Sequence, residues 1–208
     1  MLHKQTGKLI ACIAENLPFM GTDVMQKWIE NPKDLHEALH KALCPSWTNG
    51  FPMWRTLKLG TGLKTAGDFS NISEQSGCSI VTRGRNILSN PAFKVSETEA
   101  EVELVIVSVA DLGFKERATC KDIYNRAKEL GLDLCPAEVG PQLRLQYKDQ
   151  PKGEMILIGM EPIADAYGKP RVFGVMRRNC GELCLVGADG HSLSSQNVDG
   201  RWVFLRHK

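Results

Sequence analysis

The pattern of apolar and polar positions changes near residue 96 of this chain. Residues 102–109 form an almost continuous apolar run that only Glu103 and Ser108 interrupt. A run that is apolar on both faces is typical of a central strand covered on both sides. Turn residues (Gly, Pro, Asn and Asp) separate four later strand-like segments, residues 155–160, 171–176, 182–186 and 201–206. We expect residues 102–109 and 202–205 to lie in the same sheet.

Two helices are predicted between these strands. Thr119 is a good N-cap for a helix whose apolar positions share one face and which ends at Gly131. A second helical stretch begins at Pro136 and extends to Tyr147. Residues 96–208 are therefore predicted to form a mixed-sheet domain with two helices.

The first 95 residues have a mostly helical pattern. A helix with Thr22 or Asp23 as its N-cap is predicted, with further helices over residues 33–43, 65–75 and 81–88 and one short strand at residues 54–59. Residues 96–100 are polar and acidic, which suits a boundary. The fold class is thus predicted to be α+β, with a mostly helical part over residues 1–95 and a mixed-sheet domain over residues 96–208.

Composition narrows the class of protein. The chain is 42% hydrophobic and 24% charged, which are ordinary values for a folded globular protein. The apolar run at residues 9–14 is too short for a signal-peptide core, and no segment approaches the length of a membrane span. Seven scattered cysteines, an odd number, are typical of reduced thiols in a cytoplasmic protein. No membrane partner and no cofactor are predicted.

One motif suggests metal chemistry. His36, Glu37 and His40 form an HExxH sequence, in which two imidazoles on one helix face can bind Zn²⁺ while the glutamate acts as general base. The charged flanks Lys33 and Lys41 and the lack of a defined third ligand weaken this interpretation. A zinc-dependent hydrolase is therefore kept as an alternative, and no metal or catalytic residue is predicted otherwise.

A second alternative is weak nucleic-acid binding. The net charge of the chain is only +2, but residues 1–95 carry 11 basic and 7 acidic side chains. The candidate contacts are Arg55, Lys58, Lys64, Arg83 and Arg85. So small an excess of positive charge does not favour a nucleic-acid partner.

The segment around residues 136–147 is the best candidate for a binding surface. Pro136, Gly140 and Pro141 make it irregular, and irregular segments on a rigid scaffold often carry sites. Arg144 offers a five-donor guanidinium and Tyr147 an amphipathic contact, while Glu138 supplies an acceptor. The competing interpretation is an internal ion pair with a packed tyrosine.

Residues 54–65 (WRTLKLGTGLKT) and 134–147 (LCPAEVGPQLRLQY) resemble a family of bacterial conserved hypothetical proteins. The resemblance extends from about Val24 to the end of the chain and implies a bacterial cytoplasmic protein. The element order of the C-terminal half is also similar to that of C-type-lectin-like domains, a likeness of fold from which no function follows. Taken together, the sequence favours a non-catalytic binding or interaction module, whose partner is a protein or a small molecule.

Overall fold

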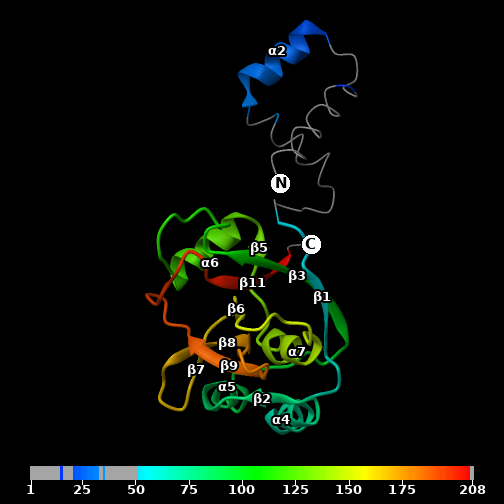
Figure 1. Cartoon of the computed structure of the whole chain (residues 1–208), viewed down its shortest axis with the longest axis vertical. Helices are drawn as coiled ribbons and strands as arrows, with labels where there is room; N and C mark the ends of the chain where they lie inside the picture. The colour runs from blue at the N-terminus through cyan, green and yellow to red at the C-terminus, as the bar shows by residue number, and fades with distance from the viewer. Residues whose placement is uncertain (1–14, 16–20, 33–34, 36–50, 207–208) are drawn as a thin grey trace. The chain divides into compact units, whose positions relative to one another are not determined.

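The computed structural model describes residues 15, 21–32, 35 and 51–206 (Figure 1). Contacts divide the chain into two units, Met1–Pro45 and Ser46–Lys208. In the first unit, helix α2 (Thr22–Glu30) confirms that a helix starts in this segment, but its N-cap is Gly21 and not Thr22 or Asp23. The helix predicted at residues 33–43 falls almost wholly outside the described residues, and so do His36, Glu37 and His40.

The second unit is built on a mixed sheet of nine strands. The strands follow the order β1 (Arg55–Leu59), β3 (Ala100–Ser108), β11 (Arg201–Arg206), β6 (Met155–Ile158), β8 (Pro170–Arg177), β9 (Leu183–Asp189) and β2 (Cys78–Ile80). Two short strands pair with its interior members, β5 (Leu132–Asp133) with β11 and β7 (Ile163–Ala164) with β8. A separate pair consists of β4 (Ala118–Thr119) and β10 (Ser195–Gln196). Helices together with a mixed sheet confirm the α+β class.

Strand β3 is a central strand, as its two-sided apolar pattern predicts. It pairs antiparallel with β1 on one side and with β11 on the other. In the second pairing, Val107 lies opposite Trp202 and Val105 opposite Phe204. The prediction that residues 102–109 and 202–205 share a sheet is confirmed.

Successive side chains along β3 and β11 point alternately into two separate hydrophobic cores. Leu104 and Val203 belong to the larger core, which also receives side chains from α4, α5 and α7. Val105 and Trp202 belong to the smaller core, which α6 covers. Because successive side chains of a strand point to opposite faces, a strand between two cores must be apolar at nearly every position.

Four helices cover this sheet: α4 (Ala66–Gln75), α5 (Thr82–Leu88), α6 (Cys120–Glu129) and α7 (Val139–Gln146). Thr65 caps α4 in a reciprocal capping box with Asp68, and the Thr119 hydroxyl caps α6 by accepting from Asp122 N. Helices α4 and α5 lie at the β2 end of the sheet, while α6 lies at the other end, beside β5 (Figure 1). All four were predicted from sequence within a few residues.

The structure places the division of the chain elsewhere than residues 95 and 96. Strands β1 and β2 both precede residue 95, yet they form the two edges of the sheet, because β1 pairs with β3 and β2 pairs parallel with β9. Residues before the predicted boundary therefore fold together with residues after it. None of the helices in the described part of the chain has the length and apolar character that a membrane span requires.

Candidate functional site

The three predicted binding residues all lie on or beside α7, and all are buried. Glu138 and Arg144 have no exposed surface, and Tyr147 retains 6%. Helix α7 packs against β1, β8 and β9, so its polar side chains are enclosed by neighbouring strands. Each of these side chains must therefore find its partners inside the protein.

Glu138 joins two loops to the start of α7. Its Oε1 accepts from Gly60 N at 2.8 Å, and its Oε2 accepts from Ser96 N at 2.7 Å. Gln142 Nε2 also donates to Oε1, at 3.1 Å. The partners of Glu138 are thus backbone amides and a neighbouring amide side chain, and the internal ion pair with Arg144 that the sequence suggested is not formed.

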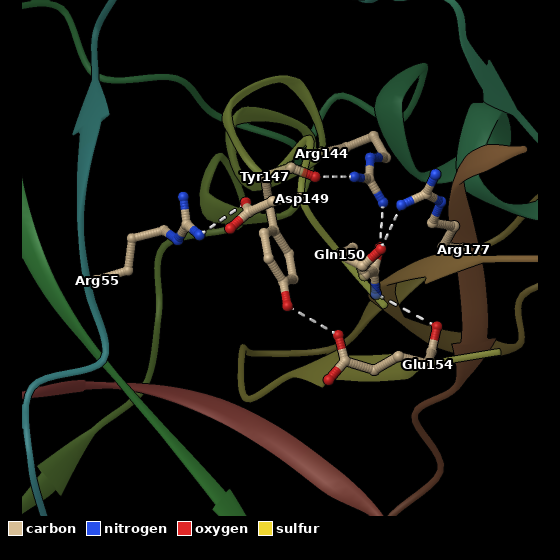
Figure 2. Close-up of polar contacts among 7 residues, drawn as sticks. All are labelled: Arg55, Arg144, Tyr147, Asp149, Gln150, Glu154 and Arg177. Carbon is tan, nitrogen blue, oxygen red and sulfur yellow. Dashed lines mark hydrogen bonds and ion pairs between the residues drawn. The ribbon is translucent and has the colours of Figure 1, made fainter. Parts of the chain in front are cut away.

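Arg144 organises the loop that follows α7 (Figure 2). Its Nη1 donates to Gln150 Oε1 and to Met176 O, the latter at 3.4 Å, and its Nη2 donates to Tyr147 O. Its Nε is buried without a hydrogen-bond partner. Because burial removes water from the guanidinium, these internal acceptors stabilise its charge.

Gln150 continues this network from the loop to strand β8. Its Nε2 donates to Val175 O at 3.1 Å and to Glu154 O at 3.3 Å. Arg177 Nη1 donates to Gln150 O at 2.8 Å, as Figure 2 shows. Side-chain hydrogen bonds therefore tie the loop after α7 to strand β8.

Tyr147 connects this buried network to residues at the protein surface. Its ring meets Trp54 edge-on, with centroids 5.1 Å apart. The guanidinium carbon of Arg55 lies 4.6 Å from the Tyr147 ring centroid, and Arg55 Nη2 pairs with Asp149 Oδ1 at 3.0 Å. The Asp149 side chain is 78% exposed, so this outer end of the network faces solvent.

The hydroxyl of Tyr147 contacts the ion pair between Glu154 and Arg201. It donates to Glu154 Oε2 at 3.0 Å, and Glu154 Oε1 accepts from Arg201 Nη1. Burial, together with the bond to Glu154, raises the pKa of Tyr147 to about 12, so the phenol remains a donor at neutral pH. The Glu154 side chain is 9% exposed, whereas that of Arg201 is 44% exposed.

Glu154 and Arg201 line a surface cavity of about 350 Å³, which we call the Glu154 groove. Two segments form its walls, and they contribute Gly153, Glu154, Met155, Gln196, Asn197, Asp199, Gly200 and Arg201. Parallel pairing of β11 with β6, which sets Arg201 opposite Ile156, brings these distant segments together. The groove therefore contains two carboxylates, one guanidinium, two amides and the partly exposed Met155.

This set of groups can both donate and accept hydrogen bonds. Arg201 only donates and the two carboxylates only accept, whereas Gln196 and Asn197 do both. One positive and two negative side chains leave a small net charge. Within the described residues, no three His, Cys, Asp or Glu side chains gather closely enough to hold a metal ion. The groove is thus suited to hold a polar molecule by hydrogen bonds.

Three of the five basic residues considered for nucleic-acid binding have side-chain partners on the protein. Arg55 pairs with Asp149, and Lys58 lies 3.5 Å from Glu99 and 3.9 Å from Glu101. Arg85 Nη2 donates to Ile80 O at 3.4 Å. Neighbouring carboxylates therefore offset much of the local positive charge around β1.

The sequence did not point to Glu154, Asn197 or Arg201. Residues 196–200 are recognisable as a turn, because Asn, Asp and Gly cluster there, but a turn alone does not indicate a site. No protein-family model, curated protein or solved structure matches the chain. A function has to be inferred from the geometry of the site itself.

Proposed function

We propose that this protein is a non-catalytic binding module whose site is the Glu154 groove. The proposed ligand is a small, neutral, hydroxyl-rich molecule of the saccharide class. A hydroxyl is both a donor and an acceptor, so neighbouring hydroxyls complement a wall in which carboxylates, amides and a guanidinium alternate. A strongly anionic ligand would meet Glu154 and Asp199, which disfavours that class.

The observation that carries this proposal is the bond from Tyr147 to Glu154. The Tyr147 hydroxyl donates to one carboxylate oxygen of Glu154, and Arg201 donates to the other. Its backbone is held as well, because Gln150 donates to Glu154 O and Arg177 N donates to the same oxygen at 3.0 Å. A ligand that meets an already ordered carboxylate loses less affinity to side-chain ordering.

In this proposal the predicted residues act indirectly. Arg144 and Tyr147 position the loop that carries Glu154, and Glu138 secures the start of the same helix. The ligand itself would contact Glu154, Asn197 and Arg201. The site therefore uses the segment that the sequence indicated, while its contact surface lies further along the chain.

The setting that we propose is a bacterial cytoplasm. The described cysteines are free thiols, as expected in a reducing compartment: Cys78, Cys120, Cys135, Cys180 and Cys184. The family resemblance of the sequence agrees with that setting.

Ligand-observed NMR with a panel of monosaccharides and disaccharides tests the proposal. At least one saccharide should give saturation transfer from the full-length protein, and Glu154→Gln should weaken that binding about tenfold, because a charged acceptor becomes a weaker neutral one. Glu129→Gln is the matched control, since Glu129 lies on α6 in an exposed ion pair with Arg126. If no saccharide binds, or if Glu154→Gln binds as the wild type does, the proposal is wrong.

A further inference from the structure

Cys78 lies beside a lysine ammonium group at the edge of the sheet. It belongs to β2, and its side chain is almost fully buried, with 4% exposed. Lys148 Nζ lies 3.3 Å from Cys78 Sγ, and the same nitrogen donates to Ser76 O at 3.2 Å. The second bond holds the ammonium group over the sulfur. At this distance the ammonium group can donate a hydrogen bond to the sulfur.

Arg144 adjoins the same sulfur from the interior, since Cys78 Sγ donates to the backbone oxygen of Arg144 at 3.8 Å. Burial lowers the pKa of Arg144. The largest effect that raises this pKa again is the interaction of Arg144 with Cys78. Both Nη atoms of Arg144 already donate to other acceptors, whereas Nε has none. A negative charge on the Cys78 sulfur would compensate this buried, incompletely bonded guanidinium.

A small cavity gives access to this position. It has a volume of about 190 Å³ and lies between α4 and β2, where its lining includes Ser73, Glu74, Cys78, Ser79 and Arg85. Glu74 is the carboxylate of this lining, and Arg85 adds a positive charge. None of its lining residues belongs to the Glu154 groove, so the two sites are separate.

The other buried cysteines have different surroundings. Burial raises the pKa of Cys120, Cys135 and Cys184, which keeps these thiols protonated and poorly nucleophilic. Cys180 is exposed and serves as an internal reference for an accessible thiol. Among the described cysteines, Cys78 combines an adjacent ammonium group, a buried guanidinium and a cavity.

We propose that Cys78 is a modification site for small hydroperoxides that enter this cavity. The thiolate sulfur attacks one peroxide oxygen, so that an S–O bond forms and the O–O bond breaks. The sulfur loses two electrons and becomes a sulfenic acid, while the peroxide gains them. The other peroxide oxygen leaves as hydroxide or alkoxide and takes a proton to form water or an alcohol, and the ammonium group of Lys148 lies where it can supply that proton.

The test compares cysteines within the same folded protein. Reduced full-length protein is treated with hydrogen peroxide, the sulfenic acid is trapped with dimedone, and each cysteine-containing peptide is quantified by mass spectrometry. Cys78 should be labelled faster than Cys180, although Cys180 is the more exposed. Lys148→Met should slow labelling of Cys78 about tenfold, because the neighbouring positive charge is lost. Lys148→Arg should retain most of the rate.

Lys128→Met provides the matched control, because Lys128 is an exposed lysine on α6. It should leave the labelling rate of Cys78 unchanged. Circular dichroism establishes that each variant remains folded, which is expected because Lys148 is also exposed. The proposal is overturned if Cys180 is labelled before Cys78, or if Lys148→Met and wild type are labelled at the same rate.

Discussion

Gln146 pairs with the backbone of Lys58 as a neighbouring strand would. Its Nε2 donates to Lys58 O at 2.9 Å, and its Oε1 accepts from Lys58 N at 3.2 Å. Lys58 lies in β1, an edge strand of the sheet, whose outward-facing backbone groups have no strand to bond. A side chain of α7 thus satisfies the edge of the sheet, which also joins the helix to β1.

Replacement of this amide should destabilise the protein. Gln146→Leu removes both bonds, so the backbone amide and carbonyl of Lys58 lose their partner in a partly shielded position. The free energy of unfolding should therefore fall by about 1–2 kcal/mol. Urea unfolding followed by circular dichroism measures the change. The matched control is Gln75→Leu at the exposed end of α4, which should change stability by less than about 0.5 kcal/mol. Equal effects of the two variants would contradict the role assigned to Gln146.

Arg144 should behave as a structural residue. Arg144→Ala removes the donors to Gln150 and Tyr147 from a fully buried position, and we expect a loss of about 3 kcal/mol or more in the free energy of unfolding. Arg178→Ala, which breaks an exposed pair with Glu182, should cost less than about 1 kcal/mol. A small loss for Arg144→Ala would instead favour direct contact between Arg144 and a ligand.

Two glycines should respond in opposite directions to the same substitution. A Cβ on Gly187 of β9 would lie 2.7 Å from the backbone of Arg83, which cannot move without displacing α5, so Gly187→Ala should cost about 1–3 kcal/mol. A Cβ on Gly67 in α4 would meet only Thr65 Oγ1, at 3.5 Å. Gly67→Ala should therefore leave stability unchanged or raise it by up to about 1 kcal/mol, because alanine favours the helix. Thermal unfolding of both variants measures the difference.

Asp165 should contribute to stability in a pH-dependent way. Its Oδ2 accepts from Arg171 Nε at 2.9 Å, and this bond, with the amides of Lys169 and Tyr167, holds the pKa of Asp165 below its ordinary range. A lowered pKa in the folded state stabilises the protein above the ordinary value of 3.8 and ceases to do so as the pH falls through the folded value.

Asp165→Asn should therefore be less stable than the wild type at neutral pH, and the difference should narrow as the pH falls below 3.8. Urea unfolding at several pH values follows this difference. Asp149→Asn is the control, since its partner Arg55 and its own side chain are solvent-accessible. A gap between wild type and Asp165→Asn that stays constant across this range would refute the assignment.

Local rules explain the part of the fold that the sequence predicts. Thr65 and Thr119 are N-caps because their hydroxyls accept from amides three residues on, an interaction within one turn of chain. The two-sided apolar run of β3 requires cover on both faces of the sheet, and the two hydrophobic cores provide it. Each signal lies within about ten residues and needs no knowledge of distant contacts.

The remaining features depend on distant contacts. Strand β2 has only three residues, too few for its alternation to be recognised, and its place is set by pairing with β9. Arg144 appears as a surface residue in sequence, but α7 is enclosed by strands, so its polar side chains become internal ties. The Glu154 groove exists only because β6 and β11 pair in parallel. The sequence alone therefore does not show that the residues of the Glu154 groove lie together.

Tyr147 should stabilise the protein up to an unusually high pH and then lose that effect. Burial and the bond to Glu154 raise its pKa from the ordinary 10.0 to about 12 in the folded state. A raised pKa means that the folded protein retains a proton that the unfolded chain has already released, so this stabilisation is fully present below the ordinary value and is lost as the pH rises through the folded value.

Tyr147→Phe lacks the phenol hydroxyl but keeps the ring against Trp54 and Arg55. Wild type should be more stable than this variant near neutral pH, and the gap should close between the two pKa values. Urea unfolding of both proteins across this range measures the gap, and near-ultraviolet absorbance of tyrosinate reports ionisation in the folded state. Ionisation of Tyr147 at its ordinary pKa, or a gap that does not close, would show that its hydroxyl is not held by Glu154.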